Sequence, residues 1–193
     1  MTKLNLVVLG GVRDNGKNMY AVEVDDQIFV CDFGLKYPDN DLMGIDVVIP
    51  DTTYLEDNID KVAGIFLSHG HADAIGALPY FVGEHDVPVF GSELTIALAK
   101  MYTSQNPKSK KFHNFHVIDA KSAIDFGDVT VSFFPTTHSI PGSLGIVIGT
   151  PVGQVVYTGD FKFDQSANQM YQTDYARLAH IGEDKVVALL SDS

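Results

Sequence analysis

Two histidines and an aspartate at alternating positions follow an apolar stretch in the first half of the chain. His69, His71 and Asp73 come directly after residues 64–67, which read Gly-Ile-Phe-Leu. On an extended segment, side chains two residues apart point the same way, so the two imidazoles can bind one metal ion. The aspartate can reach a second ion beside the first. The alternative is a polar loop whose histidines face water, but this spacing after an apolar strand favours a metal site.

Two further metal-binding side chains follow later apolar stretches. His138 comes just after residues 129–134, and Asp160 comes just after residues 154–158. Three neutral imidazoles with an open fourth position are the ligand set of a hydrolytic zinc site. The added carboxylates permit a second ion ~3.5–4 Å away, with Asp160 between the two. The predicted metal ligands are therefore His69, His71, Asp73, His138 and Asp160, and the predicted catalytic residues are Asp73 and Asp160.

Asp32 stands at the end of another apolar stretch, residues 27–32. An aspartate there is either a cap for the following loop or a hydrogen-bond partner that orients a metal-bound histidine from behind. The sequence leaves both readings open. The remaining histidines lack ligand spacing, and we interpret them as structural or solvated: His85, His113, His116 and His180.

The composition is that of a globular protein with an acidic balance. The 193 residues carry a net charge of −12, which argues against a nucleic-acid surface spread over the whole chain, because phosphate contacts need Lys and Arg. The basic run at residues 108–111 is interpreted as a solvated loop. No apolar run approaches the ~20 residues of a membrane span. Cys31 is the single cysteine, which fits a reducing compartment, and we expect a cytoplasmic protein without a membrane partner.

The pattern of apolar residues predicts a chain dominated by strands. We expect helices over residues 74–82, 92–102 and 174–180, and a long connection over residues 33–61. We expect strands over residues 4–9, 19–24, 27–32, 62–67, 87–91, 115–118, 129–134, 144–148, 154–158 and 186–190. These elements predict an α/β fold in which two packed sheets are covered by helices on their outer faces.

The chain resembles the metallo-β-lactamase superfamily, and within it the ribonuclease J family of the β-CASP group. Residues 69–74 match the H-x-H-x-D-H motif except at the last position, and His138 and Asp160 match the next two ligand motifs. The strings GKNMY, GIDVVIPD, GALPY, THSIPGS, TGDFKFD and LLSDS are more specific to ribonuclease J. The resemblance implies a four-layer αββα sandwich that binds zinc, or manganese or magnesium. It also implies 5′-to-3′ exonucleolytic and endonucleolytic cleavage of RNA, in rRNA processing and mRNA decay.

Three departures from the family pattern bear on activity. Ala74 stands where active members have a second-site histidine, as in a weakly active paralogue of Gram-positive bacteria, so we expect at most one tightly bound ion. Arg13-Asp14-Asn15 differs from the family's G-E-I stretch before Gly-Lys-Asn. The chain also stops at Ser193, where the family continues into β-CASP and C-terminal domains. We therefore expect residues 1–193 to be the N-terminal part of a metallo-β-lactamase domain, incomplete at its C-terminal side and with an apolar edge uncovered.

Two functions of different classes remain open. The first is a metal-dependent ribonuclease whose catalysis is weakened by Ala74. The second is a largely non-catalytic subunit that binds RNA or assembles with an active paralogue, as a homo-oligomer or a hetero-oligomer. In both cases the resemblance implies that RNA is bound mainly through domains outside this chain, and it identifies no substrate-binding residue. A thioesterase or lactonase of the same fold ranks last, because such enzymes keep the intact histidine motif.

Overall fold

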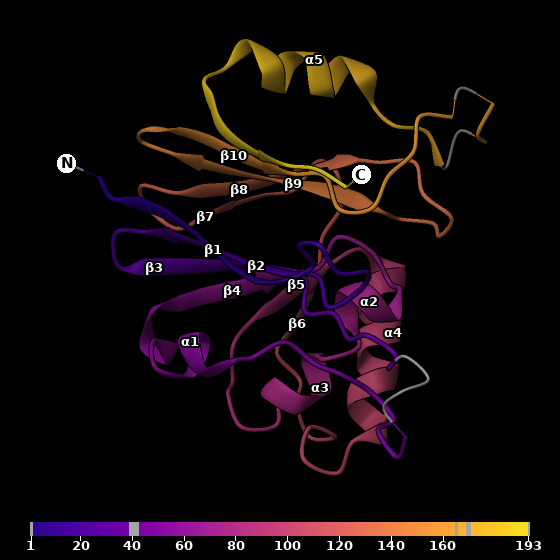
Figure 1. The fold of residues 1–193 in the computed structure, drawn as a ribbon. Coiled ribbons are helices and arrows are strands. Elements are labelled where there is room, and N and C mark those ends of the chain that lie inside the picture. Colours follow the sequence, from indigo (N-terminus) through magenta and orange to yellow (C-terminus); the bar gives the residue numbers. More distant parts are fainter. Residues whose placement is uncertain (1, 39–42, 165, 169–170, 193) are drawn as a thin grey trace.

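Two β-sheets packed face to face form the centre of the structure, a computed structural model that describes residues 2–38, 43–164, 166–168 and 171–192 (Figure 1). The first sheet has the order β1-β2-β3-β4-β5-β6, with β1 (Leu4–Gly10), β2 (Met19–Val24), β3 (Gln27–Cys31), β4 (Val62–Phe66), β5 (Val89–Gly91) and β6 (Phe115–Val117). The second has the order β11-β10-β9-β8-β7, with β7 (Ala123–Asp125), β8 (Thr130–Pro135), β9 (Leu144–Thr150), β10 (Gly153–Tyr157) and β11 (Val186–Leu190).

Strand direction explains where the metal-binding motif lies. Strands β1 to β3 form an antiparallel meander, and β3, β4, β5 and β6 then run parallel. The carboxyl ends of parallel strands meet at one edge of a sheet, where sites commonly form. The motif that begins at His69 follows the end of β4 and therefore lies at this edge. In the second sheet only β11 is parallel to its neighbour, β10.

Helices cover both outer faces, which confirms the predicted four-layer αββα architecture. The helical elements are α1 (Thr53–Glu56), η1 (Ile59–Lys61), α2 (Ala72–Ile75), α3 (Leu78–Phe81), α4 (Glu93–Gln105) and α5 (Tyr175–Glu183). Helices α1 to α4 lie on the outer side of the first sheet, and α5 lies on the outer side of the second (Figure 1). None of the helices in the described ranges is long and apolar enough to cross a membrane.

Alternating side chains in the strands build the two main apolar cores. In β3, Ile28 and Val30 pack toward the helices, whereas Phe29 and Cys31 pack between the sheets. Successive side chains on a strand point to opposite faces, so a strand covered on both sides is apolar at every position. A third, smaller cluster holds α5 to the second sheet through Ile181. The burial of apolar side chains in these three clusters holds the four layers together.

The predicted helix over residues 74–82 is wrong in one respect: the structure divides it into α2 and α3. Gly76 ends α2, and Pro79 lies in the first turn of α3. Proline has no N–H to continue a helical ladder, so it is tolerated in the first turn of a helix but not in its interior. The Ala77 amide bonds to the Phe33 carbonyl instead, at 2.9 Å. This break ties the metal-binding segment to the end of β3.

Short elements were missed by the sequence pattern. The predicted connection over residues 33–61 contains α1 and η1, and its residues 39–42 lie outside the described residues. Strand β7 was also missed, because three residues show no period and its pairing with β8 becomes visible only in three dimensions. Strand β11 is an edge strand of the second sheet and leaves Val186, Val187 and Leu189 exposed.

Gly34 permits a close approach between the end of β3 and the metal-binding segment. A Cβ atom at Gly34 would lie 1.5 Å from the Asp73 carbonyl oxygen. The Gly34 amide donates to the Asn18 carbonyl at 3.0 Å, and the Leu35 amide donates to the Ala72 carbonyl at 2.9 Å. Three separate segments therefore share hydrogen bonds at this point, with no space for a side chain.

We expect Gly34→Ala to lower the free energy of unfolding by about 1–3 kcal/mol, because its methyl group must displace backbone. The matched control is Gly182→Ala in α5, where an added Cβ meets nothing within 4 Å and helix propensity should add about 0.5–1 kcal/mol. Chemical denaturation of both variants measures the two effects. Equal stability of Gly34→Ala and the parent chain would contradict the close approach described above.

Candidate metal centre

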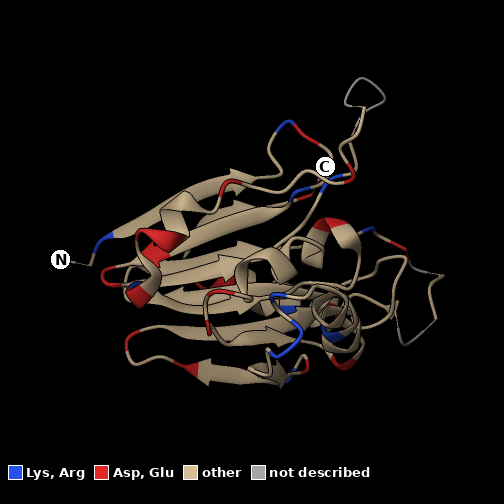
Figure 2. Ribbon diagram, turned by 90° about the horizontal axis from the view of Figure 1, so that it is seen from below, with Lys and Arg blue, Asp and Glu red and all other residues tan. Residues whose placement is uncertain are grey.

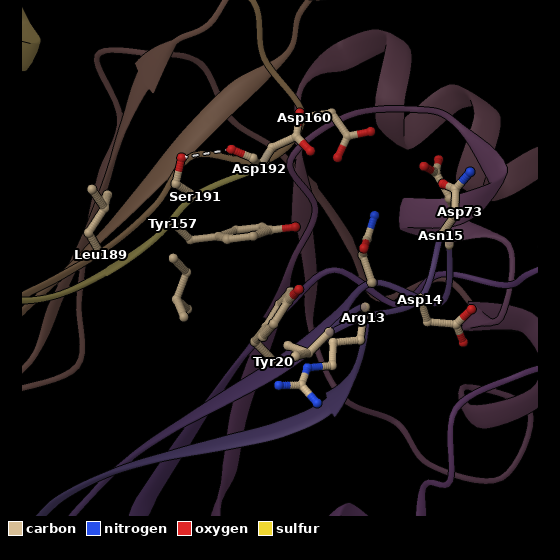
Figure 3. Close-up of a pocket in the computed structure, with 16 residues that line it drawn as sticks. Arg13, Asp14, Asn15, Tyr20, Asp73, Tyr157, Asp160, Leu189, Ser191 and Asp192 are labelled. Carbon is tan, nitrogen blue, oxygen red and sulfur yellow. Dashed lines mark hydrogen bonds between the residues drawn. The ribbon is translucent and has the colours of Figure 1, made fainter.

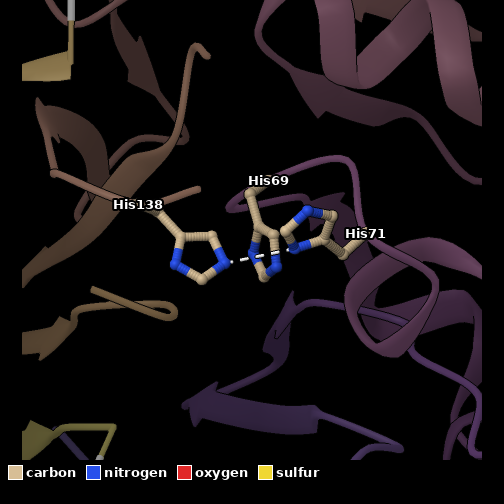
Figure 4. Close-up of side chains that lie close together, drawn as sticks. All are labelled: His69, His71 and His138. Carbon is tan, nitrogen blue, oxygen red and sulfur yellow. Dashed lines mark hydrogen bonds between the residues drawn. The ribbon is translucent and has the colours of Figure 1, made fainter. Parts of the chain in front are cut away.

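Three histidines from two sheets meet at the edge where the parallel strands end. The rings of His69, His71 and His138 lie with centroids 4.8–5.0 Å apart (Figure 4). The His138 Nε2 and His71 Nδ1 atoms are 3.1 Å apart. Each ring offers a nitrogen within 4.8 Å of the others, so the three residues could hold one metal ion. His138 follows β8 of the second sheet, so this arrangement depends on the packing of the two sheets.

Two carboxylates lie against the same histidines. The Asp73 Oδ1 and Asp160 Oδ2 atoms lie 3.7 and 3.8 Å from His69 Nε2, which is longer than a hydrogen bond. Asp160 Oδ2 is also 3.9 Å from His138 Nε2. His69, Asp73 and Asp160 form a second group whose ligand atoms lie within 4.8 Å of one another. The structure thus brings all five sequence-predicted ligands together.

The donor set fits a metal ion because one buried nitrogen in it has no partner. His69 is fully buried, and its Nε2 atom makes no hydrogen bond within the described residues. Its other nitrogen, Nδ1, lies 2.9 Å from Ser68 Oγ. An unpaired buried nitrogen costs free energy unless a ligand satisfies it. A cation facing Nε2 removes that cost.

A buried aspartate behind the histidines sets the orientation of His69. Asp32 accepts hydrogen bonds from the Ser68 amide at 2.7 Å, the Ser68 hydroxyl at 2.7 Å and the Tyr157 hydroxyl at 2.6 Å. Because Ser68 Oγ donates its proton to Asp32, it must accept from His69 Nδ1–H. That tautomer leaves the lone pair of His69 Nε2 directed at the candidate centre. Asp32 therefore acts on His69 through Ser68, and the sequence did not identify Ser68 or Tyr157.

The local charges favour a cation at this position. Burial raises the pKa of Asp160 to about 6, against the opposing effect of His69. Burial alone would lower the pKa of His69, but the carboxylates of Asp73, Asp32 and Asp160 raise it above its ordinary value. Burial and then the neighbouring His69 and His71 lower the pKa of His138 to about 4. His138 is therefore neutral at pH 7, which is the form of histidine that binds metal.

Backbone hydrogen bonds fix the segment that carries Asp73. The Asp73 carbonyl accepts from the Asn18 amide at 3.0 Å, and the Ala74 carbonyl accepts from the Phe33 amide at 2.7 Å. His71 is extended and precedes the first turn of α2, so the chain turns immediately after the second histidine. The loop before β2 and the segment after β3 thus position a ligand that follows β4.

Ala74 lies where a larger side chain has no room. Ala74 is fully buried and belongs to the apolar cluster that contains Met19 and Phe33. It does not line the cavity that Asp73 and Asp160 line. The reason is that residues 72–75 form a helical turn, so successive side chains point in different directions. A histidine at position 74 would have to displace apolar neighbours.

A cavity of about 530 Å³ opens beside the centre (Figure 3). Asp73 and Asp160 lie at its wall, and residues 11–16 form another wall. Tyr20 and Tyr157 extend between them in Figure 3. Asp192 also lines this cavity and was missed by the sequence reasoning. It follows β11 as Asp160 follows β10, so its strand-end position was the available signal.

Comparisons with known proteins agree with this geometry. The chain is 61% identical over 193 residues to "Ribonuclease J 2" of Streptococcus pyogenes serotype M3 (strain ATCC BAA-595 / MGAS315), covering 100% of the chain and 35% of that protein. It is 50% identical over 190 residues to "Ribonuclease J 2" of Staphylococcus aureus (strain NCTC 8325 / PS 47), covering 98% of the chain and 34% of that protein. The chain therefore spans about a third of the length of these relatives, and the resemblance to ribonuclease J is confirmed.

Solved structures show the same fold at low sequence identity. The metallo-beta-lactamase fold protein YhfI from Bacillus subtilis matches with a TM-score of 0.55 and 19% identity, over 83% of this chain and 64% of that one. The Rm3 metallo-beta-lactamase matches with a TM-score of 0.55 and 20% identity, over 93% of this chain and 70% of that one. The sequence profile of the Metallo-beta-lactamase superfamily matches residues 12–175. The chain belongs to the metallo-β-lactamase superfamily.

Proposed function

We propose that this chain is the metal-binding part of a cytoplasmic ribonuclease that hydrolyses RNA phosphodiesters in rRNA processing and mRNA decay. In this proposal His69, His71, His138 and Asp160 hold one divalent ion, zinc or else manganese or magnesium. The observation that carries it is the unpaired, buried Nε2 of His69, which faces the other predicted ligands. The similarity to two proteins named Ribonuclease J 2 supports RNA as the substrate. The RNA would be cleaved both from its 5′ end and internally.

A divalent ion held there would supply Lewis-acid activation of water and of the phosphate group. The chain's own residues have separate tasks. Asp73, whose pKa is held low by His69 despite burial, is ionised at neutral pH and can accept a proton from the attacking water. Ser68 and Asp32 hold the His69 ring in its tautomer. The Asp160 carboxylate provides negative charge beside His69 and His138, which would partly balance the charge of the ion.

The loop before β2 offers the donors that a phosphodiester needs. Arg13, Asn15 and Asn18 line the cavity next to Asp73. Arg13 adopts a positive φ of 56°, a backbone conformation that non-glycine residues rarely hold without a local reason. Guanidinium and amide groups bind phosphate oxygens well. We propose that this loop orients the RNA backbone across the centre.

Cleavage of 5′-labelled single-stranded RNA tests the proposal. We expect at most slow, metal-dependent cleavage by this chain, at least roughly 10-fold below that of the full-length Streptococcus pyogenes relative, because the chain spans about a third of that protein. His71→Ala should abolish the remaining cleavage, and the exposed His180→Ala on α5 should not. Cleavage that persists in His71→Ala would contradict the assignment. No cleavage under any metal would instead support a non-catalytic RNA-binding or scaffold subunit that pairs with an active paralogue.

We propose that catalysis is weakened because Ala74 supplies no ligand beside Asp73. Ala74→His should lower the free energy of unfolding of the metal-free protein by about 1–3 kcal/mol, because the imidazole overpacks an apolar cluster. Added zinc should then raise the Tm of this variant more than that of the parent chain. The new imidazole would help to hold a second zinc ion, and an ion that binds only the folded state stabilises it. Thermal unfolding with and without zinc measures both effects.

The control for that experiment is Ala72→His, in the same helical turn. Ala72 is half-buried and lines a separate cavity together with Lys36 and Tyr37. It should cost less stability and leave the zinc-induced rise in Tm at the parent value. An equal rise in all three proteins would show that position 74 does not face a second ion.

A further inference from the structure

Three tyrosines line a groove on the helical side of the molecule, away from the histidines. Tyr37 follows β3, Tyr80 lies on α3 and Tyr102 lies on α4, and together they line a cavity of about 390 Å³. Tyr37 is 62% exposed and Tyr80 is 47% exposed. Burial, followed by the neighbouring Tyr37, raises the pKa of Tyr102. We call these three residues the tyrosine groove.

The tyrosine groove and the candidate metal centre each share lining residues with a third cavity. A cavity of about 410 Å³ lies between them and is lined by Lys36, Tyr37 and Asp73, among others. Asp73 also lines the cavity at the metal centre, and Tyr37 also lines the tyrosine groove. Asp73 and Tyr37 therefore lie on the wall of one cavity, between the centre and the tyrosine groove. Lys36, which lines this cavity, is ion-paired with Asp14 at 2.8 Å.

The other end of the groove leads to the one dense run of basic residues. Asn106 and Pro107 line the groove, and the loop that follows carries Lys108, Lys110 and Lys111, which we call the lysine loop. Lys108 is ion-paired with Glu84 at 2.7 Å, which leaves Lys110 and Lys111 for phosphates. Figure 2 is a view from below, in which basic and acidic positions both occur on the helical side. Lys110 and Lys111 form no ion pair within the described part of the chain.

We propose that the tyrosine groove and the lysine loop bind single-stranded RNA outside the metal centre, as a track for the strand that enters or leaves it. The inference rests on the proposed ribonuclease function. Exposed aromatic faces stack on bases regardless of sequence, and lysines bind the phosphates that follow. A proline-rich peptide also fits aromatic grooves, but it offers no negative charge to Lys110 and Lys111.

Binding of a fluorescein-labelled 12-nucleotide oligouridine, measured by anisotropy at low salt with EDTA, tests the track without cleavage. Tyr80→Ala should weaken binding about tenfold, because one stacked base is lost, whereas Tyr80→Phe should retain parent affinity. Tyr175→Ala on α5 is the matched control, since Tyr175 is 45% exposed on the opposite layer. Equal affinity of Tyr80→Ala and the parent chain, or no RNA binding at all, would overturn the track.

The lysine loop is tested by salt dependence. The double variant Lys110→Ala/Lys111→Ala should reduce the slope of log affinity against log salt by about 1.4, for two lost phosphate contacts on a single strand. Lys3→Ala/Lys121→Ala carries the same change of charge elsewhere and should keep the parent slope. An equal reduction in both double variants would overturn a specific role for the loop.

The two hypotheses can fail separately. Tyr80-dependent RNA binding together with an absence of metal-dependent cleavage would support the track and refute the catalytic proposal. Metal-dependent cleavage together with unchanged RNA binding in Tyr80→Ala would support the catalytic proposal and refute the track. Displacement of the RNA by decaproline at the same affinity in the parent and the Lys110→Ala/Lys111→Ala variant would assign the groove to a peptide and overturn the RNA track.

Discussion

A buried carboxylate joins the two sheets at the edge where the histidines meet. Asp32 is fully buried at the end of β3 and accepts hydrogen bonds from Ser68, which follows β4, and from Tyr157 of β10. Burying an ionised carboxylate is costly unless such donors surround it, and burial raises the pKa of Asp32. The donors come from both sheets, so the sheets must pack in one arrangement to supply them. The same arrangement brings His138 to His69.

The orientation of the candidate metal ligands follows from these hydrogen bonds to Asp32. Ser68 transmits the position of Asp32 to His69, whose Nε2 atom then faces Asp73 and Asp160. The opposite wall depends on Gly34, because only a residue without a side chain allows the Asp73 backbone to approach so closely. The centre is thus fixed from two sides by ordinary backbone and hydroxyl contacts. The side chains supply the chemical groups of the centre, and the fold sets their positions.

Much of this could be predicted from the sequence, for physical reasons. The pattern of apolar residues predicted every strand of the first sheet. The polar residues just past strand ends indicated the five candidate ligands. What escaped the sequence depends on tertiary contacts. Strand β7 is too short to show a period, and the break between α2 and α3 arises from Gly76 and Pro79 inside an apolar pattern. The burial of Ala74 and the role of Ser68 became visible only when β3, β4 and α2 were placed side by side.

The central claim is that one divalent ion sits against His69, His71 and His138. Its most direct test is the amount of zinc retained per chain after dialysis, measured by elemental analysis, with the ligands identified by X-ray absorption. One ion per chain with three imidazole ligands, lost in His71→Ala and retained in His180→Ala, is the predicted result. Two tightly held ions in the parent chain, or one ion that is unaffected by His71→Ala, would contradict the account.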